Sequence, residues 1–317
     1  MRSFLPLVFC ALLLSTSLGF AASRRATESS APTCTAEVVV NAFDSATKAD
    51  LHGLKAGDFE AQALGRDYSV LKAVPVLHNR VLVLADARGA SSLSQARAIA
   101  EMVRMQAPPE MPVAFGVIAQ QPVITRGFYS DYDLFGAAMV KVFSASHAAP
   151  RTAGSSLEAA LRQGLLLFGP ARSGDTILLI TAGKRDGHLN VQKLAHEFNQ
   201  HQVRLQLLMP PEAPSSGDTV PLFSTGDAAD QFSSRLLELA ARTGGALMGF
   251  MNSDWLGAAS SGYMLSIDLP QNNGKGKLMS IELRDKEGAA DLFYPEQIAG
   301  CTASYSASAA AKTGVLP

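Results

Sequence analysis

Residues 80–103 read RVLVLADARGASSLSQARAIAEMV, and their pattern indicates the fold class of the chain. The run Val81–Ala85 is apolar without alternation, which is typical of a strand buried on both faces of a parallel sheet. From Ser92 onward apolar residues recur at helical spacing, and Ser92 with Gln95 forms a capping-box pattern. We therefore expect Asp86 at the carboxyl end of a strand, the edge at which open α/β sheets bind ligands.

Strand and helix patterns alternate through the middle of the chain. We expect Val81–Ala85, Thr176–Thr181 and Val203–Leu208 to be parallel neighbours inside one sheet, because each is short, apolar and followed by a helix pattern. Further strand patterns cover Val113–Ala119 and Val123–Phe128, which form a predicted hairpin, and Ala246–Phe250. Further helix patterns cover Asp131–Phe143, Leu157–Phe168, Val191–Phe198 and Phe232–Ala240, and a linker is predicted over Ser144–Gly154. Such alternation predicts a mainly parallel sheet with helices on both faces.

The two ends of the chain have β character without helices. Ala36–Phe43 and Tyr68–Val74 are predicted strands near the start, and β character returns after Trp255. There Gly262–Leu269 and Lys277–Leu283 are predicted to form a hairpin across a turn-rich segment. We expect these late strands to pair with the early ones. The predicted fold class is therefore α/β, a mainly parallel sheet covered by helices on both faces, with a small β unit built from the N- and C-terminal strands.

The first 21 residues have the pattern of a signal peptide. Arg2 precedes an apolar run over Phe4–Leu18, and small residues at Gly19 and Ala21 suit cleavage after Ala21. This predicts export to the periplasm or the medium without stable membrane insertion after cleavage. Residues 22–33 and 302–317 are small and polar and are expected to be disordered. The 27 basic and 28 acidic residues nearly cancel, which argues against nucleic acid as a partner.

After removal of the signal peptide the chain keeps two cysteines, Cys34 and Cys301. One precedes the first predicted strand and the other follows the last. In an exported protein this arrangement predicts a disulfide that joins the two ends of the folded part. The alternative is a pair of separate, buried thiols. No histidine lies at zinc-ligand spacing beside either cysteine, so a zinc site is not expected.

Four motifs, in order, resemble the von Willebrand factor type A-related proteins of acidobacteria. They are Ala42–Asp44 followed by Leu51–Phe59, the Asp86 strand and loop, Gly127–Asp131, and Thr243–Gly245 followed by Tyr263–Leu265. Together they span about Glu37 to Tyr294. The resemblance implies a Rossmann-like von Willebrand factor A domain over residues 77–252, flanked by β strands over 34–76 and 253–301.

The resemblance also implies a metal-ion-dependent adhesion site at the carboxyl edge of the sheet. Such a site uses an Asp-x-Ser-x-Ser motif, a Thr on a second loop and a later Asp, because magnesium needs several oxygen ligands. Here Asp86 stands at the first position, Arg88 and Ala90 replace the two serines, and Ser155 replaces the threonine. Ala182 stands where the later Asp belongs. We therefore expect no bound metal and no cofactor, with Asp86 and Ser155 as vestigial magnesium ligands and Arg88 able to place a cation where the metal would lie.

The surviving residues also have structural interpretations. Asp86 can cap its loop or pair with Arg88. Ser155 with Glu158 forms a capping box, and Tyr129 can be a packing residue rather than a rim aromatic. The functional interpretation instead makes Asp86, Arg88, Tyr129 and Ser155 a surface that binds a protein partner.

The sequence contains no nucleophile elbow, phosphate-binding loop or zinc-protease motif. We therefore favour an exported, non-enzymatic protein-binding module that has lost its metal site. One alternative is a magnesium-dependent adhesion domain that binds a protein carboxylate. A hydrolase whose catalytic residues follow no recognised pattern is a weaker alternative.

Overall fold

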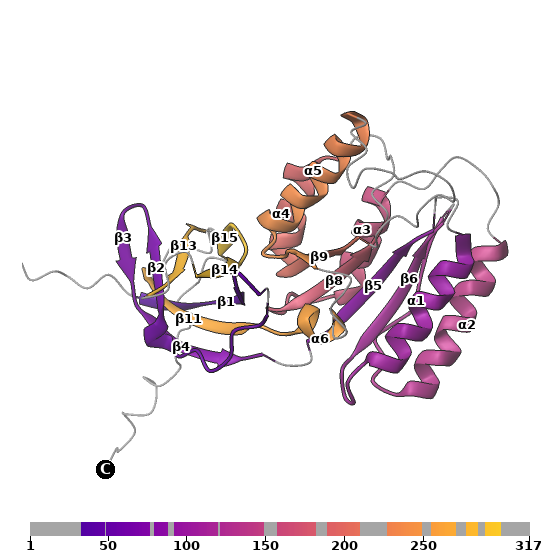
Figure 1. Ribbon diagram of the computed structural model, residues 1–317, viewed down its shortest axis with the longest axis horizontal. Helices are drawn as coiled ribbons and strands as arrows, with labels where there is room; N and C mark the ends of the chain where they lie inside the picture. The colour runs from indigo at the N-terminus through magenta and orange to yellow at the C-terminus, as the bar shows by residue number, and fades with distance from the viewer. Residues whose placement is uncertain are drawn as a thin grey trace, which may run out of the picture. The chain divides into compact units, whose positions relative to one another are not determined.

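A mainly parallel sheet, with β7 as its antiparallel edge strand, forms the centre of the protein, as the continuous apolar runs predict (Figure 1). In the described part of the chain its strand order is β10-β9-β8-β5-β6-β7. The interior strands β5 (Val81–Asp86), β8 (Asp175–Ile180) and β9 (Val203–Leu208) are adjacent and parallel. All residues of β8 and β9 are buried, which explains why neither strand alternates polar with apolar positions. The remaining strands are β6 (Val113–Ile118), β7 (Pro122–Ile124) and β10 (Leu247–Met248).

The computed structural model describes most of one unit, Pro32–Pro317. The described residues are 33–47, 49–76, 79–87, 92–119, 121–148, 157–181, 189–209, 227–248, 255–270, 277–284 and 289–298. The predicted signal peptide and C-terminal tail lie outside these ranges. Within them, no helix is both long and apolar enough to cross a membrane.

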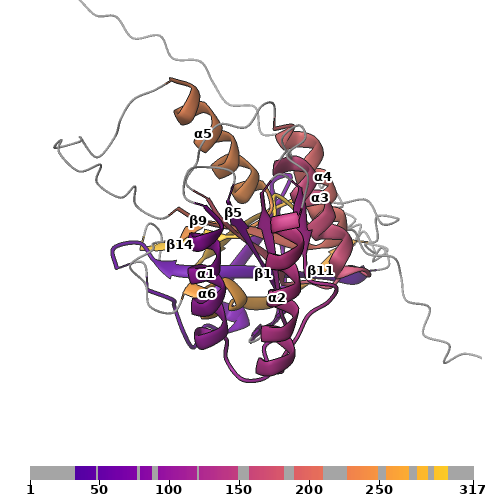
Figure 2. The same cartoon turned by 90° about the vertical axis from the view of Figure 1, so that its right-hand side faces the viewer.

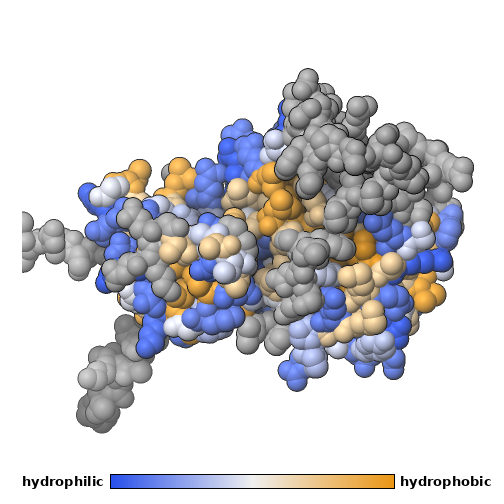
Figure 3. Space-filling model, viewed as in Figure 1, coloured by the Kyte–Doolittle hydropathy of each residue, from blue (hydrophilic) through white to orange (hydrophobic). Residues whose placement is uncertain are grey.

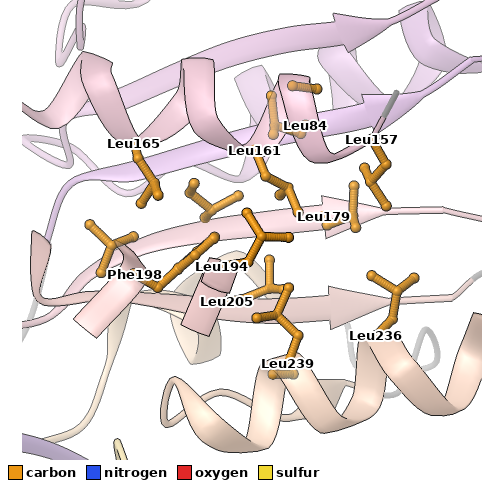
Figure 4. Close-up of a cluster of buried hydrophobic side chains, with 14 of the residues drawn as sticks. Leu84, Leu157, Leu161, Leu165, Leu179, Leu194, Phe198, Leu205, Leu236 and Leu239 are labelled. Carbon is orange, nitrogen blue, oxygen red and sulfur yellow. The ribbon is translucent and has the colours of Figure 1, made fainter. Parts of the chain in front are cut away.

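Helices cover both faces of the sheet because successive strand residues point to opposite sides. On β5, Leu82 and Leu84 belong to one apolar cluster, whereas Val81, Val83 and Ala85 belong to the other. The first face is covered by α3 (Leu157–Phe168), α4 (Val191–His201) and α5 (Asp227–Arg242), whose leucines converge on the strands in Figure 4. The second face is covered by α1 (Ser92–Gln106), α2 (Tyr132–Ala148) and α6 (Trp255–Ser260), as seen in Figure 2.

The predicted β unit is also present. Its main sheet has the order β14-β1-β11-β4, in which β1 (Thr33–Asp44) lies antiparallel to β11 (Tyr263–Pro270). The other two strands of this sheet are β4 (Val70–Pro75) and β14 (Ala290–Phe293). A second sheet contains β2 (Phe59–Ala63), β3 (Arg66–Tyr68) and β13 (Ser280–Leu283), and the pair β12–β15 joins Lys277–Leu278 to Gln297–Ile298. Early and late strands therefore share one apolar core, with Val38, Phe59, Leu265 and Ile281 among its buried residues.

The predicted late hairpin is wrong. β11 pairs with β1 and β4, whereas β13 pairs with β2, so the two late strands do not pair with each other. The turn-rich segment between them signals a change of direction, but it does not identify the partner of the next strand. Burial against Phe59 and Ala61 on β2 gives β13 its buried–exposed alternation at Ile281 and Leu283.

Three further boundaries differ from the sequence prediction. Thr33 belongs to β1 rather than to a disordered segment. Ser144–Ala148 continues α2, where Ser144 and Ser146 bond back to the carbonyls of Val140 and Val142, so the predicted linker begins too early. Trp255–Ser260 is helical and packs on the parallel sheet, although β character was expected there.

Candidate functional site

The carboxyl edge of the sheet holds Asp86 at the end of β5, as predicted. The hydroxyl of Thr181, at the end of neighbouring β8, donates a hydrogen bond of 2.9 Å to Asp86 Oδ2. Parallel strands end at the same edge, and this brings the two side chains together. Thr181 is buried, whereas Asp86 is half-buried and lies at the surface end of the pair.

The described residues of this edge supply few of the oxygen donors that magnesium needs. Among the described residues no group of three or more His, Cys, Asp or Glu side chains could hold a metal ion. Asp86 and Thr181 supply one carboxylate and one hydroxyl, and that hydroxyl proton is directed at the carboxylate. Magnesium takes about six oxygen ligands in octahedral geometry, several of them waters. Arg88, Ser155 and Ala182 lie outside the described residues, so their predicted roles stay predictions.

Tyr129 does not share this edge with Asp86. Tyr129 forms an antiparallel bridge with Val113, the first residue of β6, through hydrogen bonds of 2.8 and 3.0 Å. Asp86 is in register with Ile118, the last residue of the same strand. Five residue steps of β6 separate these positions, which corresponds to roughly 16 Å along the strand. The structure therefore does not bring Tyr129 into the surface predicted around Asp86.

The motif that contains Tyr129 has a structural role at the amino edge. Asp131 caps α2, since its Oδ1 accepts hydrogen bonds from the amides of Asp133 and Leu134 at 2.9 and 2.8 Å. Phe128 packs on Phe168 with ring centroids 4.9 Å apart. Helix initiation by Asp131 and packing by Phe128 therefore account for the presence of these residues in the motif.

The first and last motifs of the resemblance meet inside the β unit. The hydroxyl of Tyr263 donates to the carbonyl of Leu51 at 3.0 Å and accepts from the amide of Leu54 at 3.2 Å. The ring of Tyr263 packs on Phe59 at 5.9 Å. Asp58 caps its own turn through the amide of Lys55 at 2.7 Å. Tyr263 therefore fixes an irregular segment that has few backbone partners of its own.

A cluster of buried charges, which the sequence interpretation missed, lies at the amino edge. Arg80 precedes β5 and pairs through two nitrogens with Asp175, the first residue of β8, and it donates to the carbonyl of Phe168 at 2.8 Å. Asp175 is fully buried, and this burial raises the pKa of its carboxyl group, while Arg80 opposes the shift. The aromatic rings of Phe128 and Phe168 lie about the guanidinium of Arg80 at 5.4 and 5.5 Å.

Arg204, the second member of β9, connects this cluster to the β unit. Its guanidinium donates to Asn41 Oδ1 on β1, to Thr176 Oγ1 at 3.2 Å, and more weakly to the carbonyl of Ser261 at 3.3 Å. Burial lowers the pKa of Arg204 to about 10, against the attraction of Asp175. The sequence signal for this cluster was the arginine within the apolar stretch Val203–Leu208, because a charge in a strand buried on both faces requires polar partners.

Cys34, on β1, is disulfide-bonded. The chain has three cysteines, and both of the others, Cys10 and Cys301, lie outside the described residues. The pairing of Cys34 with Cys301 therefore stays a prediction.

The surface drawn in Figure 3 mixes hydrophilic and hydrophobic residues, with small separate apolar areas among the coloured atoms. Large apolar side chains that are more than half exposed include Leu64 at 91%, Met105 at 71% and Val140 at 66%. Single exposed apolar residues are normal on a soluble surface, so only their grouping is informative.

The chain is similar to several solved structures, but no sequence family matches it. No family model matches the chain, and no curated protein matches it. The von Willebrand factor type A structure from Catenulispora acidiphila is 13% identical, over 79% of this chain and 75% of that one, with a TM-score of 0.38. BatB from Bacteroides thetaiotaomicron is 17% identical, over 57% and 94% of the two chains, with a TM-score of 0.39.

The manganese-loaded TRAP protein of Plasmodium vivax is 11% identical, over 71% of this chain and 96% of that one, with a TM-score of 0.39. At these identities and TM-scores the likenesses carry no argument about function. The Rossmann-like α/β fold class rests instead on the strand order and the two helix layers of this protein.

Proposed function

We propose that this chain is an exported, non-enzymatic protein-binding module whose carboxyl edge contacts its partner without a metal ion. The observation that carries the proposal is the hydrogen bond from Thr181 to Asp86 at 2.9 Å. This hydrogen bond occupies an oxygen of Asp86, whose carboxylate is retained from the pattern of the adhesion site. In this proposal a protein donor holds the Asp86 carboxylate in the place of a cation.

The sequence around Asp86 supports the same proposal. Arg88 and Ala90 remove two hydroxyl ligands from the loop, and Ala182 removes a carboxylate from the loop after β8. Arg88 also adds a positive charge, which disfavours a divalent cation nearby by electrostatic repulsion. A polar loop with one arginine suits a carboxylate on a protein partner, since arginine binds carboxylates through paired hydrogen bonds.

The predicted signal peptide and the Cys34 disulfide support the exported location. Structural disulfides form and persist in oxidising compartments. We propose that Cys34 pairs with Cys301 and that the resulting link closes the β unit at the ends of the folded chain.

Thermal unfolding in the presence of magnesium tests the metal-free site. Saturating ligand at a hundredfold excess over its dissociation constant would stabilise the native state by about 2.7 kcal/mol. We expect the melting temperature to stay unchanged in millimolar magnesium or manganese. A clear rise that disappears in Asp86→Ala would instead support the magnesium-dependent adhesion domain.

Partner capture tests the binding role. The wild-type chain, immobilised and exposed to periplasmic extract or culture medium, is expected to retain a protein that Arg88→Glu retains poorly. Arg126→Glu is the matched control, because Arg126 is exposed near the opposite edge of the sheet. Equal loss of the captured protein in both variants would contradict a site at the carboxyl edge.

A further inference from the structure

We draw no further inference here: the strongest candidate, the cavity of about 30 Å³ that Arg204 and Asn199 line where β1, β9 and the end of α4 meet, carries nothing, because the Arg204 Nε and Asn199 Oδ1 atoms that lack a hydrogen-bond partner among the described residues are themselves closed to solvent, and nothing in the structure shows what would occupy the cavity.

Discussion

Arg204→Met tests whether a buried guanidinium joins the β unit to the parallel sheet. The substitution keeps an unbranched apolar side chain of similar length and removes the charge and all donors. It leaves Asn41 Oδ1, Thr176 Oγ1 and the carbonyl of Ser261 without this donor. The guanidinium also donates weak hydrogen bonds to the carbonyls of Gly174 and Ala259, each at 3.4 Å.

The expected loss follows from two opposing contributions. Burial lowers the pKa of Arg204 to about 10, which means that burial of the charge opposes folding by about 3 kcal/mol near neutral pH, and the substitution removes this penalty. Hydrogen bonds from charged donors contribute about 1.5–3 kcal/mol each, and the bonds to Asn41 and Thr176 are the two strong ones. Acceptors left buried without a donor add about 1–3 kcal/mol each. The two lost bonds outweigh the relieved penalty by up to about 3 kcal/mol, and two unpaired acceptors add at least about 2 kcal/mol. We therefore expect a net loss of about 3–5 kcal/mol, the range for a broken buried charge pair.

Urea unfolding measured by two probes gives the free energy. Trp255 is the single tryptophan of the chain, and it is buried in α6, four residues before Ala259. Its fluorescence therefore reports on the helix at this junction, while far-ultraviolet circular dichroism reports on the whole fold. We expect both transitions of Arg204→Met to move to lower urea, with the tryptophan transition moving at least as far.

Two comparisons sharpen this prediction. Arg235→Met removes an arginine that is exposed on α5 and should change stability by less than about 0.5 kcal/mol. Asn41→Leu combined with Arg204→Met should recover part of the loss, because no polar group at Asn41 then remains unpaired. A neutral or stabilising Arg204→Met single variant would refute the reasoning, since it would mean that the five contacts do not offset the burial of the charge.

Three further variants test local features of the fold. Leu64→Asn should raise stability by about 1 kcal/mol in urea unfolding, because Leu64 has a φ of 53° in a two-residue hairpin turn that favours asparagine; no gain would argue against this turn. Gly245→Ala should cost about 1–3 kcal/mol, since a Cβ there would lie 1.8 Å from the carbonyl oxygen of Leu205, whereas Gly57→Ala, with open space, should be near neutral. Cys301→Ser should lower the melting temperature as much as reduction of the wild type does, and a non-reduced peptide map that links Cys34 to Cys10 would contradict the pairing.

Sequence patterns predicted the elements whose burial is two-sided or strongly periodic. The runs at β5, β8 and β9 were assigned within one residue, and α3 was assigned at its observed bounds. The composition of these segments is enough to predict their burial, because a strand between two helix layers must be apolar throughout. The presence of a small β unit was also predicted, from β character at both ends of the chain.

Features that depend on distant partners were not predictable in the same way. The partner of β13 is β2, more than 200 residues earlier, and no local turn signal contains that information. The six-residue helix α6 is too short to be stable alone and depends on the contacts of Trp255 and Leu256 with the sheet. The buried partners of Arg204 come from three separated segments.

The position of Tyr129 shows a different limit. The hairpin β6–β7 was predicted, and an antiparallel return necessarily carries the chain back toward the amino edge. Tyr129 was nevertheless grouped with Asp86 because the motif resembles a segment of a family with a functional carboxyl edge. The predicted hairpin therefore already implied that Tyr129 lies near the amino edge, whereas the similarity of the motif implied the carboxyl edge.

The pairing of β1 with β11 sets the order in which this chain can fold. Asn41 and the carbonyl of Ser261, at the junction of these strands, are hydrogen-bonded across 220 residues of sequence. Contacts so distant form late, because the entropy of closing the intervening loop must be overcome first. The central sheet can therefore assemble before β1 has paired with β11, and until then the apolar residues Val38, Val39 and Val40 of β1 are not buried by that strand. During synthesis β1 is open to mispairing until β11 has been made, so a chain interrupted before β11 should aggregate through its own first strand.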